Sequence, residues 1–239
     1  MTLALAALGL AAGVLTTLAG QGGGLFLLLA SSAVVGPHAA LALTAPALLV
    51  GNAHRAFMLR RSVDRGVAKR MIAGALPGAP VGGMLAGAIP TGALRALLLA
   101  LTLVVILKAL GKLVFDVPRG ALAPAGFVVG AMTGTAGGAG VLVAPILLAT
   151  GLTGSAFVGT TSTIAVAMHA GRVVAYGATG LFARDLVLPT FAVAVSIALG
   201  NALAARVAYG KRRLPARVTT SLEYVVLAVC AVLSVAGVG

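Results

Sequence analysis

Two glycine-rich stretches interrupt the apolar sequence: Gly20-Gln21-Gly22-Gly23-Gly24 in the first half and Gly137-Gly138-Ala139-Gly140 in the second. Each separates a full-length apolar run from a shorter one, Leu25–Val35 and Val141–Thr150. Spread-out glycines suit close helix packing, whereas contiguous glycines favour a break in the helix. A helix over Val141–Thr150 spans about 15 Å, which is half of the hydrocarbon core of a bilayer. The two stretches therefore predict broken helices.

The composition assigns the apolar runs to a membrane. Of the 239 residues, 60% are hydrophobic and 9% are charged, whereas soluble domains carry about 25% charged residues. This excludes a soluble enzyme, and the apolar content excludes a disordered chain. Because lipid offers backbone groups no water, each run must satisfy its own hydrogen bonds as a helix. We therefore expect an all-α polytopic membrane protein.

The charged residues and the single cysteine limit which partners and cofactors we expect this chain to bind. The formal net charge is +13, and Trp is absent. The basic residues fall mainly in short loops, as the positive-inside rule predicts, and few aromatic rings are present to stack on bases. We expect the lipid bilayer as a partner and no nucleic acid. The single Cys230 excludes an intramolecular disulfide or a cysteine metal cluster, and we expect no metal or other cofactor.

The two halves of the chain repeat. Adding 117 to a residue number lays equivalent residues on one another: Gly13 on Gly130, Gly23 on Gly140, Thr44 on Thr161, Asn52 on His169, and Arg55 on Arg172. One offset thus aligns both glycine breaks and both intramembrane arginines. We predict two membrane repeats, residues 1–118 and 119–239, within one integral membrane domain.

Each repeat contains about five apolar segments. They are Leu3–Ala19, Leu25–Val35, His38–Leu59, Met71–Ile89 and Gly92–Leu110, then Ala121–Ala136, Val141–Thr150, Ser155–Tyr176, Leu186–Val207 and Thr219–Val238. If each broken unit crossed once, the basic loops Arg60–Arg70 and Lys211–Arg217 would face opposite sides, against the positive-inside rule. If each unit crosses twice or enters and returns, the repeats are inverted and both loops are cytoplasmic. We expect inverted repeats in the cytoplasmic membrane, a plan found in secondary transporters.

The glycine stretches lie at the N-termini of the two short helices. Unpaired backbone N–H groups and the positive end of the helix dipole favour anions there. Pro145 agrees with a first-turn position. The alternative is that these glycines serve helix packing, as we expect of Gly74, Gly78, Gly82, Gly83 and Gly87. We assign substrate binding to Gly22, Gly23, Gly24, Gly138, Ala139 and Gly140. Valine at Gly23 or at Gly140 is expected to block binding and leave the fold intact.

Polar side chains within the predicted spans extend this site. Arg55 and Arg172 are candidates because intramembrane ionisable residues mark functional sites, the alternative being that they snorkel to the headgroups. The other candidates are Thr44, Asn52, Thr161, Ser162 and His169. His169 has no partner at metal-ligand spacing, and no Asp or Glu lies deep in a span. A carboxylate proton relay or a cation site is therefore disfavoured, and the site should prefer an anion.

The glycine stretches also carry a family resemblance. Gly13…Gly20-Gln21-Gly22-Gly23-Gly24 and its echo Gly130…Gly137-Gly138-Ala139-Gly140…Pro145 resemble the duplicated signature of the TauE/SafE sulfite exporter family, also called the toluene sulfonate uptake permease family. The resemblance extends through nearly the whole chain. It implies transport of sulfite, thiosulfate, sulfoacetate or other organosulfonates. Leu28 is a departure, because the first short helix would often carry Pro there.

We therefore expect a secondary transporter of a small sulfur-containing oxyanion, working by alternating access, with a homodimer as an allowed assembly. No catalytic residue is assigned. An anion channel with the same site is a second hypothesis. An intramembrane hydrolase using Ser162 and His169 is a third, but their spacing on one helix puts them about 10 Å apart, too far for a nucleophile–base pair.

The inverted arrangement predicts the accessibility of three loop positions. Cysteines introduced at Ser62 and Ala216 should both react with an impermeant thiol reagent from the cytoplasmic side, because both basic loops face the cytoplasm. A cysteine at Thr179 should react from outside. Labelling of Ser62 and Ala216 from opposite sides of the membrane would contradict the inverted arrangement.

Overall fold

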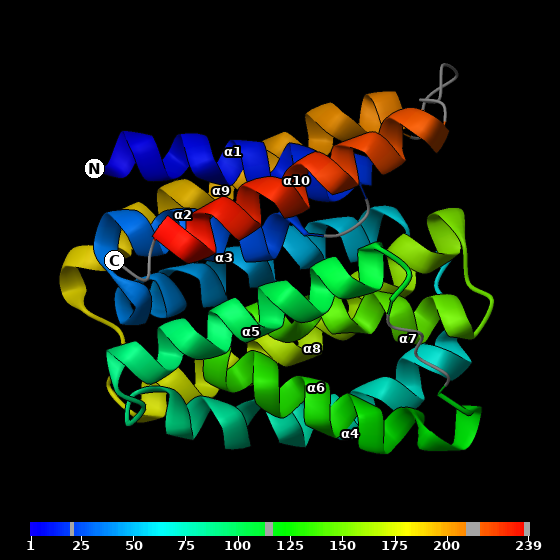
Figure 1. The fold of residues 1–239 in the computed structure, drawn as a ribbon, viewed down its shortest axis with the longest axis horizontal. Helices are drawn as coiled ribbons and strands as arrows, with labels where there is room; N and C mark the ends of the chain where they lie inside the picture. Colours follow the sequence, from blue (N-terminus) through cyan, green and yellow to red (C-terminus); the bar gives the residue numbers. More distant parts are fainter. Residues whose placement is uncertain (20–21, 113–116, 209–215, 237–239) are drawn as a thin grey trace.

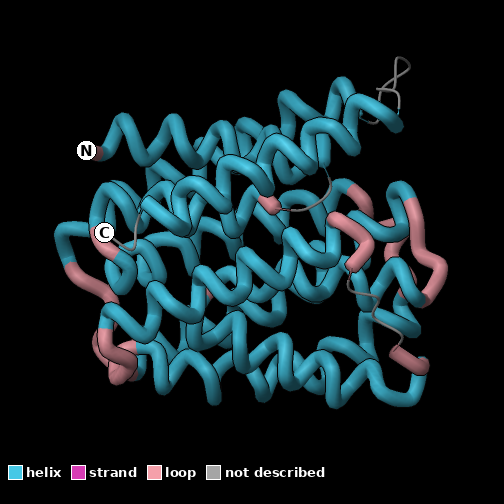
Figure 2. Tube along the Cα trace, in the orientation of Figure 1, coloured by secondary structure: helices cyan, strands magenta, loops and turns pink. Residues whose placement is uncertain are grey.

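The chain is almost entirely helical. The computed structural model describes residues 1–19, 22–112, 117–208 and 216–236. Within these ranges the chain forms ten α-helices and three short 3-10 helices, and no strand occurs there (Figures 1 and 2). The all-α prediction is confirmed. Gly20, Gln21 and most of the predicted basic loop Lys211–Arg217 lie outside the described residues.

The helices follow the predicted segments closely. Those of the first half are α1 (Thr2–Ala19), α2 (Gly23–Val35), α3 (Pro37–Met58), α4 (Arg65–Ala86) and α5 (Thr91–Ala109). Those of the second half are η1 (Arg119–Ala121), α6 (Leu122–Ala136), η2 (Gly138–Leu142), α7 (Val143–Ala149), α8 (Gly154–Ala178), η3 (Arg184–Leu186), α9 (Val187–Ala208) and α10 (Ala216–Ala236). Both predicted helix breaks are present.

Helix α4 begins six residues before the predicted apolar segment. The carboxylate of Asp64 accepts hydrogen bonds from the backbone N–H groups of Gly66 (2.9 Å) and Val67 (3.0 Å). An aspartate cap of this kind satisfies N–H groups that have no partner inside the helix. The basic stretch Arg65–Arg70 is therefore helical and not a loop.

Among the described residues, two helical segments are long and apolar enough to span a bilayer, judged by length and composition alone. They are Thr2–Ala19 and Arg184–Ala208. Helices α3, α4 and α8 are as long, and their glycines, prolines and polar side chains keep their hydropathy lower. Some of these polar side chains are buried inside the protein. A test of length and hydropathy alone therefore does not select these three helices.

The halves of the chain pack through equivalent helices. In the 117-residue register α1 corresponds to α6, α3 to α8 and α4 to α9. Helix α1 lies against α9, and α6 lies against α4. The two corresponding central helices, α3 and α8, pack on each other. Each outer pair therefore joins one helix of the first half to one of the second.

Helix ends gather at two faces of the bundle (Figure 1). At the right in Figure 1, the α3–α4 connection lies beside the start of α6, where Arg70 Nη1 donates to the Arg119 carbonyl oxygen (3.5 Å). We call this face the basic end, and define it by Arg60, Arg61, Arg65, Lys69, Arg70 and Arg119. At the opposite end, His38 Nε2 lies 3.0 Å from the Ile89 carbonyl oxygen.

Glycines let α4 approach α6 backbone to backbone. A Cβ built on Gly74, Gly78 or Gly82 would lie only 1.8–2.3 Å from a carbonyl oxygen of α6. In return, Gly126, Gly130 and Gly134 of α6 face carbonyl oxygens of α4 at 2.1–2.7 Å from the same built position. Backbone atoms inside two helices cannot move aside independently. The packing role predicted for Gly74, Gly78 and Gly82 is therefore confirmed.

This contact predicts a large effect from a single methyl group. Gly82→Ala should lower the free energy of unfolding by about 2 kcal/mol, because its Cβ would meet the Ala131 carbonyl oxygen at 1.8 Å. Gly92→Ala is the matched control, since nothing lies within 4 Å of its Cβ, and it should change stability by no more than about 0.5 kcal/mol. Thermal unfolding of the purified variants measures both. Equal melting temperatures would contradict the packing role.

Candidate functional site

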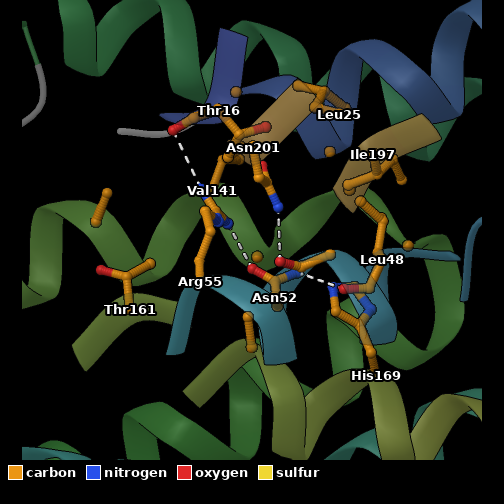
Figure 3. Close-up of a pocket in the computed structure, with 18 residues that line it drawn as sticks. Thr16, Leu25, Leu48, Asn52, Arg55, Val141, Thr161, His169, Ile197 and Asn201 are labelled. Carbon is orange, nitrogen blue, oxygen red and sulfur yellow. Dashed lines mark hydrogen bonds between the residues drawn. The ribbon is translucent and has the colours of Figure 1, made fainter. Parts of the chain in front are cut away.

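A cavity of about 70 Å³ lies where the two glycine stretches meet (Figure 3). Its backbone lining comes from both breaks: Gly22, Gly24, Gly137, Gly138 and Gly140. Its polar side chains are Thr16, Asn52, Arg55, Thr161, His169 and Asn201. Because one water needs about 10–15 Å³ of such volume, the cavity has room for several waters or one small oxyanion.

The backbone at both breaks has a conformation that suits glycine. Gly22 precedes α2 with φ 88° and ψ −30°, and Gly137 precedes η2 with φ 76° and ψ −35°. L-residues with a side chain rarely adopt such positive φ values. The N-cap residues Gly22 and Gly137 have no side chain that could accept a hydrogen bond from these helices. Among the described residues, no side chain accepts from the first N–H groups of α2 and η2 beside the cavity.

Two of the predicted backbone residues face away from the cavity. A Cβ built on Gly23 would lie 1.9 Å from Thr16 Oγ1 and 2.4 Å from the Ala12 carbonyl oxygen, so Gly23 packs against α1. Ala139 is fully buried in the hydrophobic core. The expectation that valine at Gly23 leaves the fold intact is therefore wrong. At Gly140 the nearest atom to a built Cβ is Met168 Cε at 3.8 Å, and this residue lines the cavity.

Arg55 reaches the cavity from α3 and does not snorkel. Its Nη1 donates to the Thr16 carbonyl oxygen (3.1 Å), and its Nη2 donates to Asn52 Oδ1. Asn52 in turn donates through Nδ2 to the Leu48 carbonyl oxygen (2.8 Å), as the dashed lines of Figure 3 mark. Both side chains are more than nine-tenths buried. Arg55 thus holds a positive charge at the cavity wall, inside the protein.

Arg172 lies behind the cavity wall. It is completely buried, is not among the lining residues, and lies at the junction of three helices. Its Nη2 donates to the Leu41 carbonyl oxygen of α3 (3.2 Å), and its Nε donates to the Tyr176 hydroxyl (3.3 Å). The Tyr176 hydroxyl donates to the Gly134 carbonyl oxygen of α6 (2.6 Å). Arg172 Nη1 lies 3.1 Å from His169 Nδ1, and His169, unlike Arg172, lines the cavity.

The predicted hydroxyl residues also differ in whether they line the cavity. Thr161 lines the cavity, and its Oγ1 has no hydrogen-bond partner among the described residues. Thr44 is fully buried and turns its hydroxyl to the Leu41 carbonyl oxygen of its own helix (3.4 Å). Ser162 is buried away from the cavity. No hydrogen bond joins Ser162 to His169 among the described residues, so the structure does not show the nucleophile–base pair of the hydrolase hypothesis.

The sequence reading missed two polar residues of the lining, Thr16 in α1 and Asn201 in α9. Asn201 donates through Nδ2 to the Gly51 carbonyl oxygen (2.9 Å), and its Oδ1 accepts from Thr17 Oγ1 (2.9 Å). An Asn in the middle of an apolar segment is a detectable signal, by the rule that selected Asn52. Among the described residues, no group of three His, Cys, Asp or Glu side chains is placed to hold a metal.

The match to a known family covers these features. The sequence profile described as Sulfite exporter TauE/SafE matches residues 5–236, which include both glycine stretches and every residue of the cavity. No match was found among curated proteins or among solved structures. The resemblance carried by the glycine stretches is confirmed. The chain belongs to the TauE/SafE sulfite exporter family, a family of membrane transporters.

Proposed function

We propose that the protein is a secondary transporter that moves a sulfur-containing anion across the cytoplasmic membrane by alternating access. Sulfite, thiosulfate, sulfoacetate and other organosulfonates are the candidate substrates. Membership of the TauE/SafE family supports the transport role and a small anionic substrate. The observation that carries the proposal is the cavity, whose described lining contains the buried Arg55 and, among those described residues, no Asp or Glu.

The donors around the cavity suit an oxyanion. Arg55 supplies a positive charge, Thr161 supplies a hydroxyl without a described partner, and the breaks supply backbone N–H groups. Hydrogen bonds from charged donors and helix N-termini are the ones strong enough to replace the hydration of an anion. Because Arg55 and most of the other lining residues are buried, each of these interactions is stronger than at a surface. An anion in this cavity would therefore be bound without a metal or a cofactor.

The helix arrangement supports two inverted repeats, residues 1–118 and 119–239. Helix α2 leads from the first break toward the opposite end, where His38 contacts Ile89. Helix α7 leads from the second break toward the basic end, where the Asp64 N–H donates to Thr160 Oγ1 (2.9 Å). The two short helices thus leave the cavity in opposite directions. Rocking of one repeat against the other would open the cavity to each end in turn.

Charge supports the orientation of the protein in the membrane. The basic end carries six Lys and Arg residues in the described α3–α4 and η1 regions. The opposite end carries Arg95 near the start of α5 and Arg184 with its neighbour Asp185. By the positive-inside rule the basic end faces the cytoplasm. An anion approaching from that side would also meet a positive surface potential.

A transport assay of the Arg55 variants tests this function. Proteoliposomes containing the wild type should accumulate sulfite or thiosulfate, and Arg55→Ala should reduce thiosulfate affinity by roughly ten- to hundredfold, because a charged hydrogen bond is lost. Arg55→Lys should recover part of the loss, since it keeps the charge without the planar donor pair.

The control for this assay is Arg95→Ala, which removes a half-buried charge outside the cavity and should transport as the wild type does. Equal transport by the wild type and Arg55→Ala would contradict the proposed site. Continuous conductance in planar bilayers, in place of saturable uptake, would instead favour an anion channel.

The two glycine breaks predict opposite effects of similar substitutions. Gly140→Val should weaken thiosulfate binding at least tenfold and leave the melting temperature nearly unchanged, because its side chain enters the cavity and not a packed wall. Gly23→Ala should lower the melting temperature, since its Cβ would overlap Thr16 and Ala12. Titration and thermal unfolding of both purified variants measure the difference. Normal binding by Gly140→Val would exclude the anion from the tip of η2.

A further inference from the structure

We infer that Arg172 is a positioning residue that fixes the tautomer of His169, and that the Nε2–H group of His169 donates a hydrogen bond to the bound anion. This inference rests on the proposed function, because it names a donor within the same cavity. It separates the roles of two arginines that occupy equivalent positions in the sequence repeat. Arg55 faces the anion directly, whereas Arg172 acts through His169.

The hydrogen-bonding groups of Arg172 determine the tautomer of His169. A guanidinium group has only hydrogen-bond donors, so the 3.1 Å contact between Arg172 Nη1 and His169 Nδ1 requires Nδ1 to accept. A neutral imidazole that accepts at Nδ1 carries its proton on Nε2. His169 has no other hydrogen bond among the described residues, and it lines the cavity. Its Nε2–H group is therefore the part of the ring left for a ligand.

Arg172 itself is held in place from several sides. Its other hydrogen bonds go to the Leu41 carbonyl oxygen and to the Tyr176 hydroxyl, and the Tyr176 hydroxyl donates to the Gly134 carbonyl oxygen. A Cβ built on Gly137 would lie 2.8 Å from Arg172 Nη2, so the guanidinium packs directly against the second glycine break. It cannot enter the cavity without leaving these partners. Its position is that of a support for His169.

The first repeat contains the equivalent contact, between an arginine and the polar residue three positions before it. Arg55 donates to Asn52 Oδ1 one helical turn earlier, as Arg172 donates to His169 Nδ1. Asn52 donates one N–H of its amide to the Leu48 carbonyl oxygen of its own helix (2.8 Å) and keeps a second N–H. Each repeat therefore has a side-chain N–H donor at the equivalent position of the cavity lining, an amide in one and an imidazole in the other. The anion would be bound asymmetrically, by a guanidinium and an amide on one side and by an imidazole on the other.

Helix α8 presents a second donor on the same face. Thr161, Ala165 and His169 follow one another at intervals of four residues, and all three line the cavity. Residues four apart share a helix face. Thr161 Oγ1 has no described hydrogen-bond partner, so a hydroxyl and an imidazole N–H lie on one stripe with only a small alanine between them. The two donors are eight residues apart, about 12 Å along the helix axis, so they lie at opposite ends of the part of α8 that lines the cavity.

Two substitutions of His169 test the donor. The amide nitrogen of Gln reaches the position of Nε2, whereas that of Asn ends near Nδ1. His169→Gln should therefore bind thiosulfate within about threefold of the wild type, and His169→Asn should bind it roughly ten- to hundredfold more weakly. Calorimetric titration of the full-length protein in detergent measures both, and both variants leave Arg172 its other partners. Equal affinity of His169→Asn and the wild type would overturn the donor role.

Nitrogen NMR of ¹⁵N-histidine-labelled protein tests the tautomer independently of binding. The His169 signals are those that His169→Gln removes, and they should report a protonated Nε2 and an unprotonated Nδ1 in the wild type. Arg172→Met should abolish this preference and weaken thiosulfate binding. Tyr176→Phe should keep both, even with a lower melting temperature, because it leaves the Arg172–His169 contact. A protonated Nδ1 in the neutral wild-type ring would overturn the inference.

The failure of this inference is distinguishable from failure of the proposed function. A wild type that binds neither thiosulfate nor sulfite would overturn the proposed function, and the donor role of His169 with it. A wild type that binds thiosulfate and loses no affinity in His169→Asn or Arg172→Met would leave the transport site intact. In that case only the assignment of His169 and Arg172 would be wrong.

Discussion

A helix that breaks inside a membrane leaves backbone N–H and carbonyl groups that lipid cannot satisfy. Here both breaks lie inside the protein, where Gly22 and Gly137 adopt positive φ values before α2 and η2. The broken ends must therefore face each other, the neighbouring helices or a ligand. This requirement explains why the breaks share one cavity and why polar side chains line it.

The same requirement governs the two buried arginines. A guanidinium group in the interior is costly unless its N–H groups find acceptors. Arg55 meets this condition with the Thr16 carbonyl oxygen and Asn52, and Arg172 meets it with the Leu41 carbonyl oxygen, Tyr176 and His169. These acceptors lie on different helices, so each arginine also ties together elements that surround the cavity. The proposed binding site and the packing of the helices therefore share the same hydrogen bonds.

Glycine has three physical roles in this chain. In α4 and α6 it permits contact between backbones, as at Gly82; at Gly22 and Gly137 it permits a left-handed backbone conformation; at Gly140 it leaves space in the cavity. The first role stabilises the bundle, and the last keeps space in the cavity that we propose for the substrate. A substitution therefore has different consequences at each position, although the residue replaced is the same.

Much of the architecture follows from the sequence alone. Apolar runs require helices in lipid, contiguous glycines break them, and charge accumulates in loops; each of these effects acts within a few residues of one segment. The all-α fold and both breaks could be predicted for that reason, whereas the family was predicted from the resemblance of the glycine stretches to its signature. The inverted arrangement of the repeats and the substrate remain predictions. The start of α4 was the local exception, because the Asp64 cap was not recognised.

The direction of each side chain was decided by the tertiary structure. Repeat equivalence pairs Gly23 with Gly140 and Arg55 with Arg172, yet only Gly140 and Arg55 line the cavity. The sequence does not specify which neighbour a helix face meets, because Thr16 and Asn201 come from helices at the two ends of the chain. Side-chain environments depend on contacts between such distant segments, which no local pattern contains. The sequence alone therefore determined the fold class and the breaks, and packing determined which of their residues face the cavity.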